Sequence, residues 1–470
     1  MNFILSYFYT RYYFNPKVLS VGRILISLII LLDLFFRYQN FEAHYTNNGV
    51  LPTSVIKTYY PFYQYYFSIH NFIESPTLLH ILFWIHFISA LILLIGWNTR
   101  LFTIINFVLI LSLHHRNPVI LQGGDDLLRI TLFYMIFLPW GSFYSIDSFL
   151  QKKKNLEIVH STTNFSWIFV IFQINIGFVY LFSALLKTAD EWRISGDAIY
   201  YALSLDTLRT SFGNLIYQQY PLTRVLTFIV YYGFEIIAPL LIIFSPTISL
   251  RKLGAISIIL LHLFIVSALK VGIFPFVGIT TALMLLVNQK DLPSKIKTNK
   301  NELLFSIILF VLILRYNLAT LQVPYFSITL WEDRFLNSIG LSQRWNMFSP
   351  GVKRYYGWLV LRGIKSNNTE WDLIHNTPNL HYEATPLNKN FLKGDRWRKF
   401  LENYEQQHYN FIKPYFCYYL IQQWNEKHPE NTIEALNILF VKKETLPNYQ
   451  FKTEIENLSL CNINIEKQSQ

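Results

Sequence analysis

Stretches of predominantly apolar residues, each near the length of a bilayer crossing, recur along the first two thirds of the chain. A helix needs about 20 such residues to cross the hydrocarbon core. Backbone groups in lipid must be paired within the segment itself, so runs of this kind fold as helices. We predict an all-α polytopic membrane bundle with about nine transmembrane helices. The predicted spans are 18–36, 78–97, 101–121, 126–146, 165–187, 222–245, 253–269, 272–289 and 303–321.

The net charge of +11 raises the question of a nucleic-acid partner. The lysines and arginines lie largely in short segments between the apolar runs or in the polar C-terminal part, where membrane topology places them. Neither a basic stripe nor a recognisable nucleic-acid-reading motif accompanies them. We therefore expect membrane lipid as a partner and exclude nucleic acid.

Three connections between predicted spans concentrate basic residues: 152–155, 251–252 and 290–300. With nine spans, all three fall on the same side, which the positive-inside rule assigns to the cytoplasm. No cleavable signal peptide is evident, so we expect the first span to act as the targeting signal. The predicted topology has a cytoplasmic N-terminus and an extracytoplasmic C-terminal part. The richness in Asn, Lys, Ile, Tyr and Phe indicates an AT-rich bacterial genome and hence a bacterial inner membrane.

The composition changes near residue 322, which divides the chain into a transmembrane domain, 1–321, and a small extracytoplasmic α+β domain, 322–470. Cys417 and Cys461 both lie in the second domain, and their spacing leaves open whether they form a disulfide or remain free thiols. The expected elements there are a hairpin of strands 357–364 and 369–374, a helix over 394–407 capped by Asp395, a helix over 411–429 and a strand over 433–443.

Ionisable side chains inside predicted spans are costly and therefore point to function more often than they would in a soluble protein. Glu235 lies near the middle of span 222–245, where an ionised carboxylate needs a partner and is otherwise protonated. His262 is a second polar group within a span, and it is either a hydrogen-bonded packing residue or a ligand. Lys187 ends span 165–187, where it either reaches the headgroups as an anchor or is held among helices as a desolvated amine that can act as a base.

A further cluster of charges opens the fourth predicted span in the sequence GGDDLLR. Asp125 and Asp126 suit the N-terminus of a helix, and Arg129 is placed at helical spacing to pair with either of them. Asp33 and Arg37 are four residues apart and can pair in the same way in the first span. We find no histidine or cysteine spacing typical of a metal site and predict none.

Lys187, with Tyr180 seven residues before it and Trp192 and Gly196 after it, resembles the signature of the vitamin K-dependent γ-glutamyl carboxylase family and of its bacterial relatives, the horizontally transferred transmembrane domain (HTTM) proteins. The likeness covers most of the chain. Other similar stretches are FEAHYTNNGVLP (41–52), LLIGWNTR (93–100), FYSIDSFL (143–150), VGIF (271–274) after His262, and QRWNMFSP (343–350).

The resemblance implies a chemistry. In the carboxylases, a lysine at the position of Lys187 deprotonates reduced vitamin K, the product reacts with oxygen, and the strong base so formed takes a proton from the γ-carbon of a glutamate, which then adds carbon dioxide. It implies reduced vitamin K or menaquinol as cofactor, oxygen and carbon dioxide as co-substrates, and a secreted peptide as partner. Glu235 and His262 become supporting groups.

Three departures from the carboxylase pattern separate this chain from the animal enzymes. Their histidine near the start of the fourth span is absent, since Gly124 lies at the corresponding place with Asp125 beside it. The spacing from Trp192 to Gly196 is one residue longer, and the C-terminal domain is much shorter. Quinol oxygenation is therefore compatible with the sequence even where glutamate carboxylation is lost.

Three functions stay open at this point. The first is a quinol-dependent carboxylase or epoxidase, which predicts a pocket joining Lys187, Glu235 and His262. The second is a membrane factor for maturation or export of a secreted peptide, similar to sporulation-delaying protein B, which predicts an outer groove under residues 340–470. The third is a structural or transport protein whose polar residues only pack helices.

Overall fold

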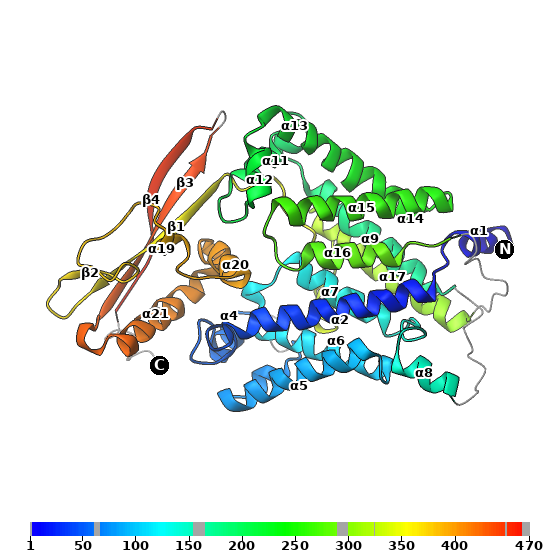
Figure 1. Ribbon diagram of the computed structural model, residues 1–470, viewed down its shortest axis with the longest axis horizontal. Helices are drawn as coiled ribbons and strands as arrows, with labels where there is room; N and C mark the ends of the chain where they lie inside the picture. Colours follow the sequence, from blue (N-terminus) through cyan, green and yellow to red (C-terminus); the bar gives the residue numbers. More distant parts are fainter. Residues whose placement is uncertain are drawn as a thin grey trace.

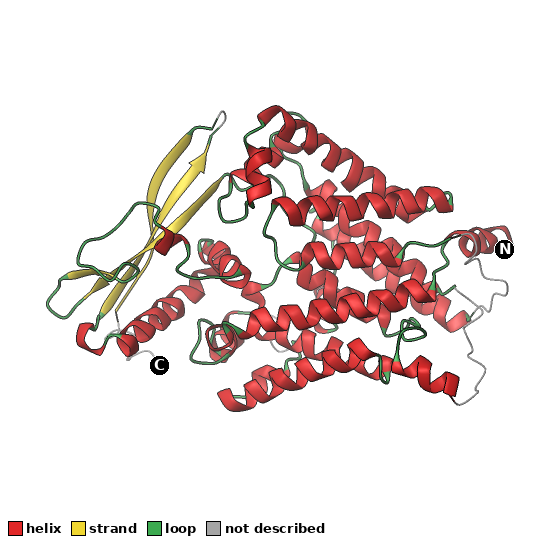
Figure 2. Ribbon diagram, viewed as in Figure 1, coloured by secondary structure: helices red, strands yellow, loops and turns green. Residues whose placement is uncertain are grey.

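Helices make up one long body of the molecule, and the strands are gathered at one end of it (Figure 2). The structure is a computed structural model that describes residues 2–60, 66–153, 165–288, 299–323, 325–446 and 449–462. Residues 154–155 and 290–298 of the basic connections used in the topology prediction lie outside these ranges.

Six helices among the described residues are long and apolar enough to cross a membrane, which agrees with an integral membrane protein. The other three predicted spans contain shorter or less apolar helices, so the number nine remains a prediction. The six are α2 (Pro16–Tyr38), α5 (Pro76–Ile95), α9 (Trp167–Leu186), the continuous helix Tyr220–Phe244, α15 (Ile248–Ala268) and α17 (Lys300–Thr320). The other three are α6 (Thr99–Arg116), α7 (Gly123–Met135) and α16 (Phe274–Met284).

Short helices connect the long ones at both ends of the bundle (Figure 1). Near the N-terminus, Arg251 donates to the carbonyl of Tyr13, so the 251–252 connection lies at the end of the bundle opposite the sheet. The short helices are α1 (Asn2–Arg11), α3 (Phe41–Tyr45), α4 (Thr53–Tyr59), η2 (Ile69–Phe72), η3 (Pro118–Ile120), α8 (Ile146–Lys153), α10 (Asp190–Arg193), α11 (Ala198–Ser204), α12 (Ser211–Tyr217) and α18 (Leu330–Ser338).

Helix α9 lies at the centre of the bundle, with 83% of its apolar stretch buried by protein. Small residues let its neighbours approach closely, as is usual between membrane helices. A Cβ atom on Gly177 of α9 would lie 2.4 Å from the side chain of Ile243, and one on Gly254 of α15 would lie 2.7 Å from the carbonyl oxygen of Ala238. Side chains on α9 therefore face other helices rather than lipid.

The C-terminal domain contains one antiparallel sheet in the order β2-β1-β3-β4. The predicted hairpin is confirmed as β1 (Tyr355–Ile364) and β2 (Glu370–Asp372), and the predicted strand as β3 (Ala435–Thr445). Strand β4 (Phe451–Asn462) was not predicted, because its polar and charged residues give no apolar run. The remaining helices are α19 (Pro386–Lys389), α20 (Asp395–Tyr404), η6 (Gln407–Ile412), α21 (Lys413–Lys427) and η7 (Pro429–Asn431).

The N-cap of α20 and the pairing of the two cysteines are defined by the structure. Helix α20 begins at Asp395 with Gly394 at the N-cap, so Asp395 occupies the first turn and is not the capping residue. Its carboxylate instead pairs with Arg398, at 2.7 Å. A disulfide joins Cys417 of α21 to Cys461 of β4, so the two cysteines are paired rather than free thiols. The bond links the helix covalently to the sheet.

Candidate functional site

Lys187 follows the last residue of α9 and is 1% exposed. Its Nζ atom donates to the hydroxyl of Ser183 at 2.7 Å and to the carboxylate of Glu235 at 2.9 Å. The ring of Trp192 lies 4.8 Å from the same atom. A lysine that anchors a helix at the headgroups would leave its amine in water, so the structure contradicts that alternative.

Glu235 lies in a π-helical segment, η4 (Ile229–Ile237), between α13 (Tyr220–Phe228) and α14 (Ala238–Phe244). Pro239 has no N–H, so it cannot donate to the carbonyl of Glu235 as a residue of an α-helix would. The N–H of Ala238 donates to the carbonyl of Gly233, five residues before it, which is the hydrogen bond of a π-helix. The outer face of the segment exposes Ile229, Tyr232 and Ile237, while Glu235 is 9% exposed. The buried carboxylate and these exposed apolar side chains therefore belong to the same helical segment.

Tyr180 and His262 form a second buried pair. The Tyr180 hydroxyl lies 2.7 Å from Nε2 of His262, and the histidine ring packs against Phe274. Gly278 of α16 makes room for the ring, because a Cβ atom there would lie 2.0 Å from Nε2. The other ring nitrogen, Nδ1, is buried and has no hydrogen-bond partner within the described part of the chain.

The two pairs share one face of α9. Tyr180, Ser183 and Lys187 follow each other at spacings of three and four residues, which places them in a line along the helix. At a rise of about 1.5 Å per residue, the pairs are about 10 Å apart along the axis. The structure thus brings together four residues that the sequence singled out, from three different helices.

Trp192 and its neighbour Glu191 hold the segment that leads into the C-terminal domain. The indole N–H of Trp192 donates to the carbonyl of Phe348, at 2.9 Å. The carboxylate of Glu191, 5% exposed, accepts from the backbone N–H of Val352 and from Arg354. Sequence reasoning missed Glu191, since an acidic residue beside a span end carries no signal of a partner about 160 positions away.

Gly196 adopts a backbone conformation and a close contact that favour glycine. It adopts a φ of +77°, and a Cβ atom there would lie 2.9 Å from the ring of Phe228. Glycine adopts this left-handed conformation without strain and also permits the contact with α13. Gly196 therefore shapes the chain after Trp192.

Asp125 lies away from Lys187, where the membrane domain contacts α20. Its carboxylate binds Arg37 of α2 and Arg396 of α20, and Arg396 also contacts Asp33 at 2.7 Å. Asp33 pairs with Arg37 at 2.7 Å as predicted. Burial opposes the charge of Arg396, but the two carboxylates outweigh it and raise the pKa of the guanidinium.

Asp126 and Arg129 extend this junction. They pair at 2.8 Å, which is one of the two predicted arrangements, and Arg129 also donates to the carbonyl of Gly340. No contact within the described residues joins Asp125, Asp126 or Arg129 to Lys187. Asp125 and Arg129 therefore contact the C-terminal part of the chain directly, and Asp126 contributes through its pair with Arg129.

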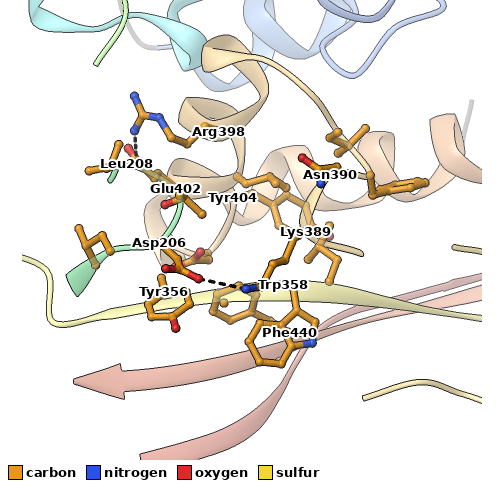
Figure 3. A pocket seen from close by; sticks show the side chains of 18 of the residues that line it. Asp206, Leu208, Tyr356, Trp358, Lys389, Asn390, Arg398, Glu402, Tyr404 and Phe440 are labelled. Carbon is orange, nitrogen blue, oxygen red and sulfur yellow. Dashed lines mark hydrogen bonds and ion pairs between the residues drawn. The ribbon is translucent and has the colours of Figure 1, made fainter. Parts of the chain in front are cut away.

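A cleft of about 520 Å³ lies between the C-terminal domain and the loops of the membrane domain at this end (Figure 3). Aromatic side chains of β1 and β3, including Tyr356, Trp358 and Phe440, line the sheet side. Ion pairs surround it, among them Lys353 with Glu405 and Lys389 with Asp206. Burial raises the pKa of Glu405 even with Lys353 beside it.

The cleft and the lysine site are connected through the chain. Phe348 accepts from Trp192, and Lys353, five residues later, lines the cleft. Five residues span at most about 18 Å when fully extended. Both places therefore lie close to the same stretch of backbone.

Comparison with known proteins gives one match. A family model described as the HTTM domain matches residues 13–290, more than half of the chain. The matched part contains Lys187, Glu235, Tyr180 and His262, and it ends before the C-terminal sheet. No curated protein and no solved structure matches the chain.

Proposed function

Because this chain belongs to the HTTM domain family, we propose that it is a vitamin K-dependent γ-carboxylase-like membrane protein in which Lys187 is the base for a reduced quinone. The observation that carries the proposal is the buried pair of Lys187 and Glu235, at 2.9 Å. An amine that meets a lipophilic quinol has to lie in a dry place near lipid. Glu235 is buried on a helical segment whose other side chains include the exposed, apolar Ile229 and Ile237, which supports this.

Glu235 supplies what a buried lysine needs in order to act as a base. An ammonium group has no lone pair, so Lys187 must first give up a proton. The Glu235 carboxylate accepts from Nζ directly, and a proton passing to it leaves a free amine beside a neutral acid. Burial penalises the charged pair and therefore favours this transfer. The Ser183 hydroxyl keeps the amine oriented.

The Tyr180–His262 pair offers a hydrogen-bond donor for an oxygen atom of the quinone. When the Tyr180 hydroxyl donates to Nε2 of His262, the proton of the neutral ring is on Nδ1, a buried donor without an acceptor among the described residues. A buried donor of this kind costs free energy unless a ligand accepts from it. The reduced quinone, when bound, supplies an acidic hydroxyl and the site of reaction with oxygen.

The proposed setting is a bacterial inner membrane, with the N-terminus in the cytoplasm and the C-terminal domain outside. The N-terminus and the sheet lie at opposite ends of the bundle, as this topology requires (Figure 1). The disulfide of Cys417 and Cys461 suits an oxidising compartment. A secreted peptide would then reach the cleft, where carbon dioxide addition to a glutamate follows if carboxylation is retained.

The cleft itself favours a second candidate function, maturation or export of a secreted peptide without quinone chemistry. Its volume of about 520 Å³ and its aromatic and charged lining suit a peptide segment. In that case the Lys187–Glu235 pair would only hold helices together.

Quinol epoxidation separates the two functions. Wild-type protein in liposomes receives reduced vitamin K or menaquinol with oxygen, and the epoxide is measured for wild type, Lys187→Ala and the exposed control Lys57→Ala. The proposal expects epoxide from wild type and Lys57→Ala and none from Lys187→Ala. Folded wild-type protein that forms no epoxide with either quinol would contradict it and favour the peptide factor.

A further inference from the structure

The loop after β2 gathers two histidines around one aspartate. Asp372 is the last residue of β2, and His375 and His381 follow it at spacings of three and nine residues. Nδ1 of His375 lies 2.9 Å from Oδ2 of Asp372, and Nδ1 of His381 lies 3.3 Å from the same oxygen. The two imidazole rings are 4.3 Å apart.

We propose that Asp372, His375 and His381 form a binding site for a divalent transition-metal ion of the zinc class. One potential ligand atom from each of the three residues lies within 4.8 Å of the others. Zinc bonds to histidine nitrogen and carboxylate oxygen are about 2.0–2.2 Å long, so two ligands of a tetrahedral ion are about 3.3–3.5 Å apart. The two distances to Oδ2 are close to that separation.

The ligand atoms are held in place by groups around them. Oδ1 of Asp372 accepts from the backbone N–H groups of Ile374 and His375, which fixes the orientation of the carboxylate. Nε2 of His375 lies 2.8 Å from the hydroxyl of Thr385. A partner on the second ring nitrogen is the usual support of a metal-binding histidine, because it fixes the ring and the tautomer.

Oδ2 of Asp372 is crowded without an ion. The backbone N–H of His381 donates to it, and both imidazole nitrogens point at it as well. A carboxylate oxygen has two lone pairs, so three donors compete for them. An ion bound between the three side chains removes both ring hydrogens from this competition.

One side of the site is open to solvent. The side chain of His381 is 43% exposed, whereas those of Asp372 and His375 are nearly buried. Three protein ligands leave one position of a tetrahedral ion to water. The loop continues through Thr385 into α19, where Asn388 and Lys389 line the cleft, so a bound ion would also stabilise one wall of the cleft.

Metal titration of the purified full-length protein tests the site. Protein in detergent is stripped with EDTA, dialysed and titrated with Zn²⁺ alone, and with Co²⁺ as a visible-absorption probe. The variant is His381→Gln, and the matched control is His408→Gln, an exposed histidine of the same domain. The side chain of His381 is exposed, so we expect its replacement to leave the fold intact.

We expect one Zn²⁺ per chain, a tetrahedral Co²⁺ spectrum and a higher melting temperature with Zn²⁺ for wild type and His408→Gln. We expect His381→Gln to bind at least about 10- to 100-fold more weakly, the loss caused by removing even a supporting partner of a ligand, and to lose the shift. Equal binding by wild type and His381→Gln would overturn the proposal, as would wild-type protein that takes up no Zn²⁺. Both outcomes are independent of quinone chemistry.

Discussion

Nζ of Lys187 lies 2.9 Å from Oε2 of Glu235, although 48 residues separate the two in the chain. Each is buried, and each is the main charged partner that the other contacts. Their functions are therefore coupled: a change at one leaves the other as an unpaired group in an apolar place.

Replacing Glu235 with Gln is expected to lower quinol turnover by about 100-fold or more, because the lysine loses the group that takes its proton. Turnover in liposomes is the measurement. Glu302→Gln, in which another glutamate at a helix end is changed, is the control. Normal turnover by Glu235→Gln would show that Lys187 does not pass its proton to this carboxylate.

Breaking the pair from one side is also expected to reduce stability. Lys187→Met leaves Glu235 without its partner, and removing one member of a buried pair of this kind costs about 3 to 5 kcal/mol. The double variant Lys187→Met, Glu235→Leu is expected to melt at a higher temperature than Lys187→Met alone. Melting temperatures in one detergent decide this, and additive losses from the two changes would argue against direct coupling.

Gly278→Ala is expected to displace the ring of His262, because the new Cβ atom would lie 2.0 Å from Nε2. The hydrogen bond to Tyr180 would break, and displacements of about 1 Å at a reacting site can cost about 100-fold in rate. Gly233→Ala is the matched control, since no atom lies within 4 Å of its Cβ position. If both variants kept wild-type turnover, the Tyr180–His262 pair would have no part in the reaction.

Arg396→Met is expected to loosen the C-terminal domain from the membrane domain. It leaves Arg37 as the arginine that still contacts both buried carboxylates, Asp33 and Asp125, and the loss is expected to cost about 3 to 5 kcal/mol. Limited proteolysis is the measurement, with Lys399→Met of the same helix as control. Equal cleavage of the two variants would show that this charge cluster does not hold the junction.

The sequence predicted the local elements better than their assembly. The hairpin of β1 and β2 follows from the stretches GWLVLRGI and TEWDLI on either side of SNN. The buried charges were found because lysine, glutamate and histidine are rare in apolar runs. That Lys187 meets Glu235 rather than lipid headgroups depends on how α9 packs against η4, which no spacing encodes. The partners of Arg396 could not be predicted either. The sequence of α20 has the pattern of an ordinary amphipathic helix, and Asp33 and Asp125 contact Arg396 only in the folded chain.

Some signals were present but had no clear meaning in the sequence. Pro239 marks the place where the helix departs from its normal hydrogen bonding, yet a proline in a span is also compatible with a simple kink. Asp372 and the two histidines of the loop after β2 lie at spacings that match no common metal motif, so only the fold shows that they converge.

Lys187→Arg tests the central claim most directly. Arginine keeps the positive charge beside Glu235 and can hold the same ion pair, but its guanidinium is not deprotonated in proteins. Epoxide formation is measured in liposomes for the variant and for wild type, after melting curves have shown that both are folded. If Lys187 is the base, the variant is folded and forms no epoxide. If the variant forms epoxide at the wild-type rate, the lysine is needed only for its charge, and the proposed chemistry is wrong.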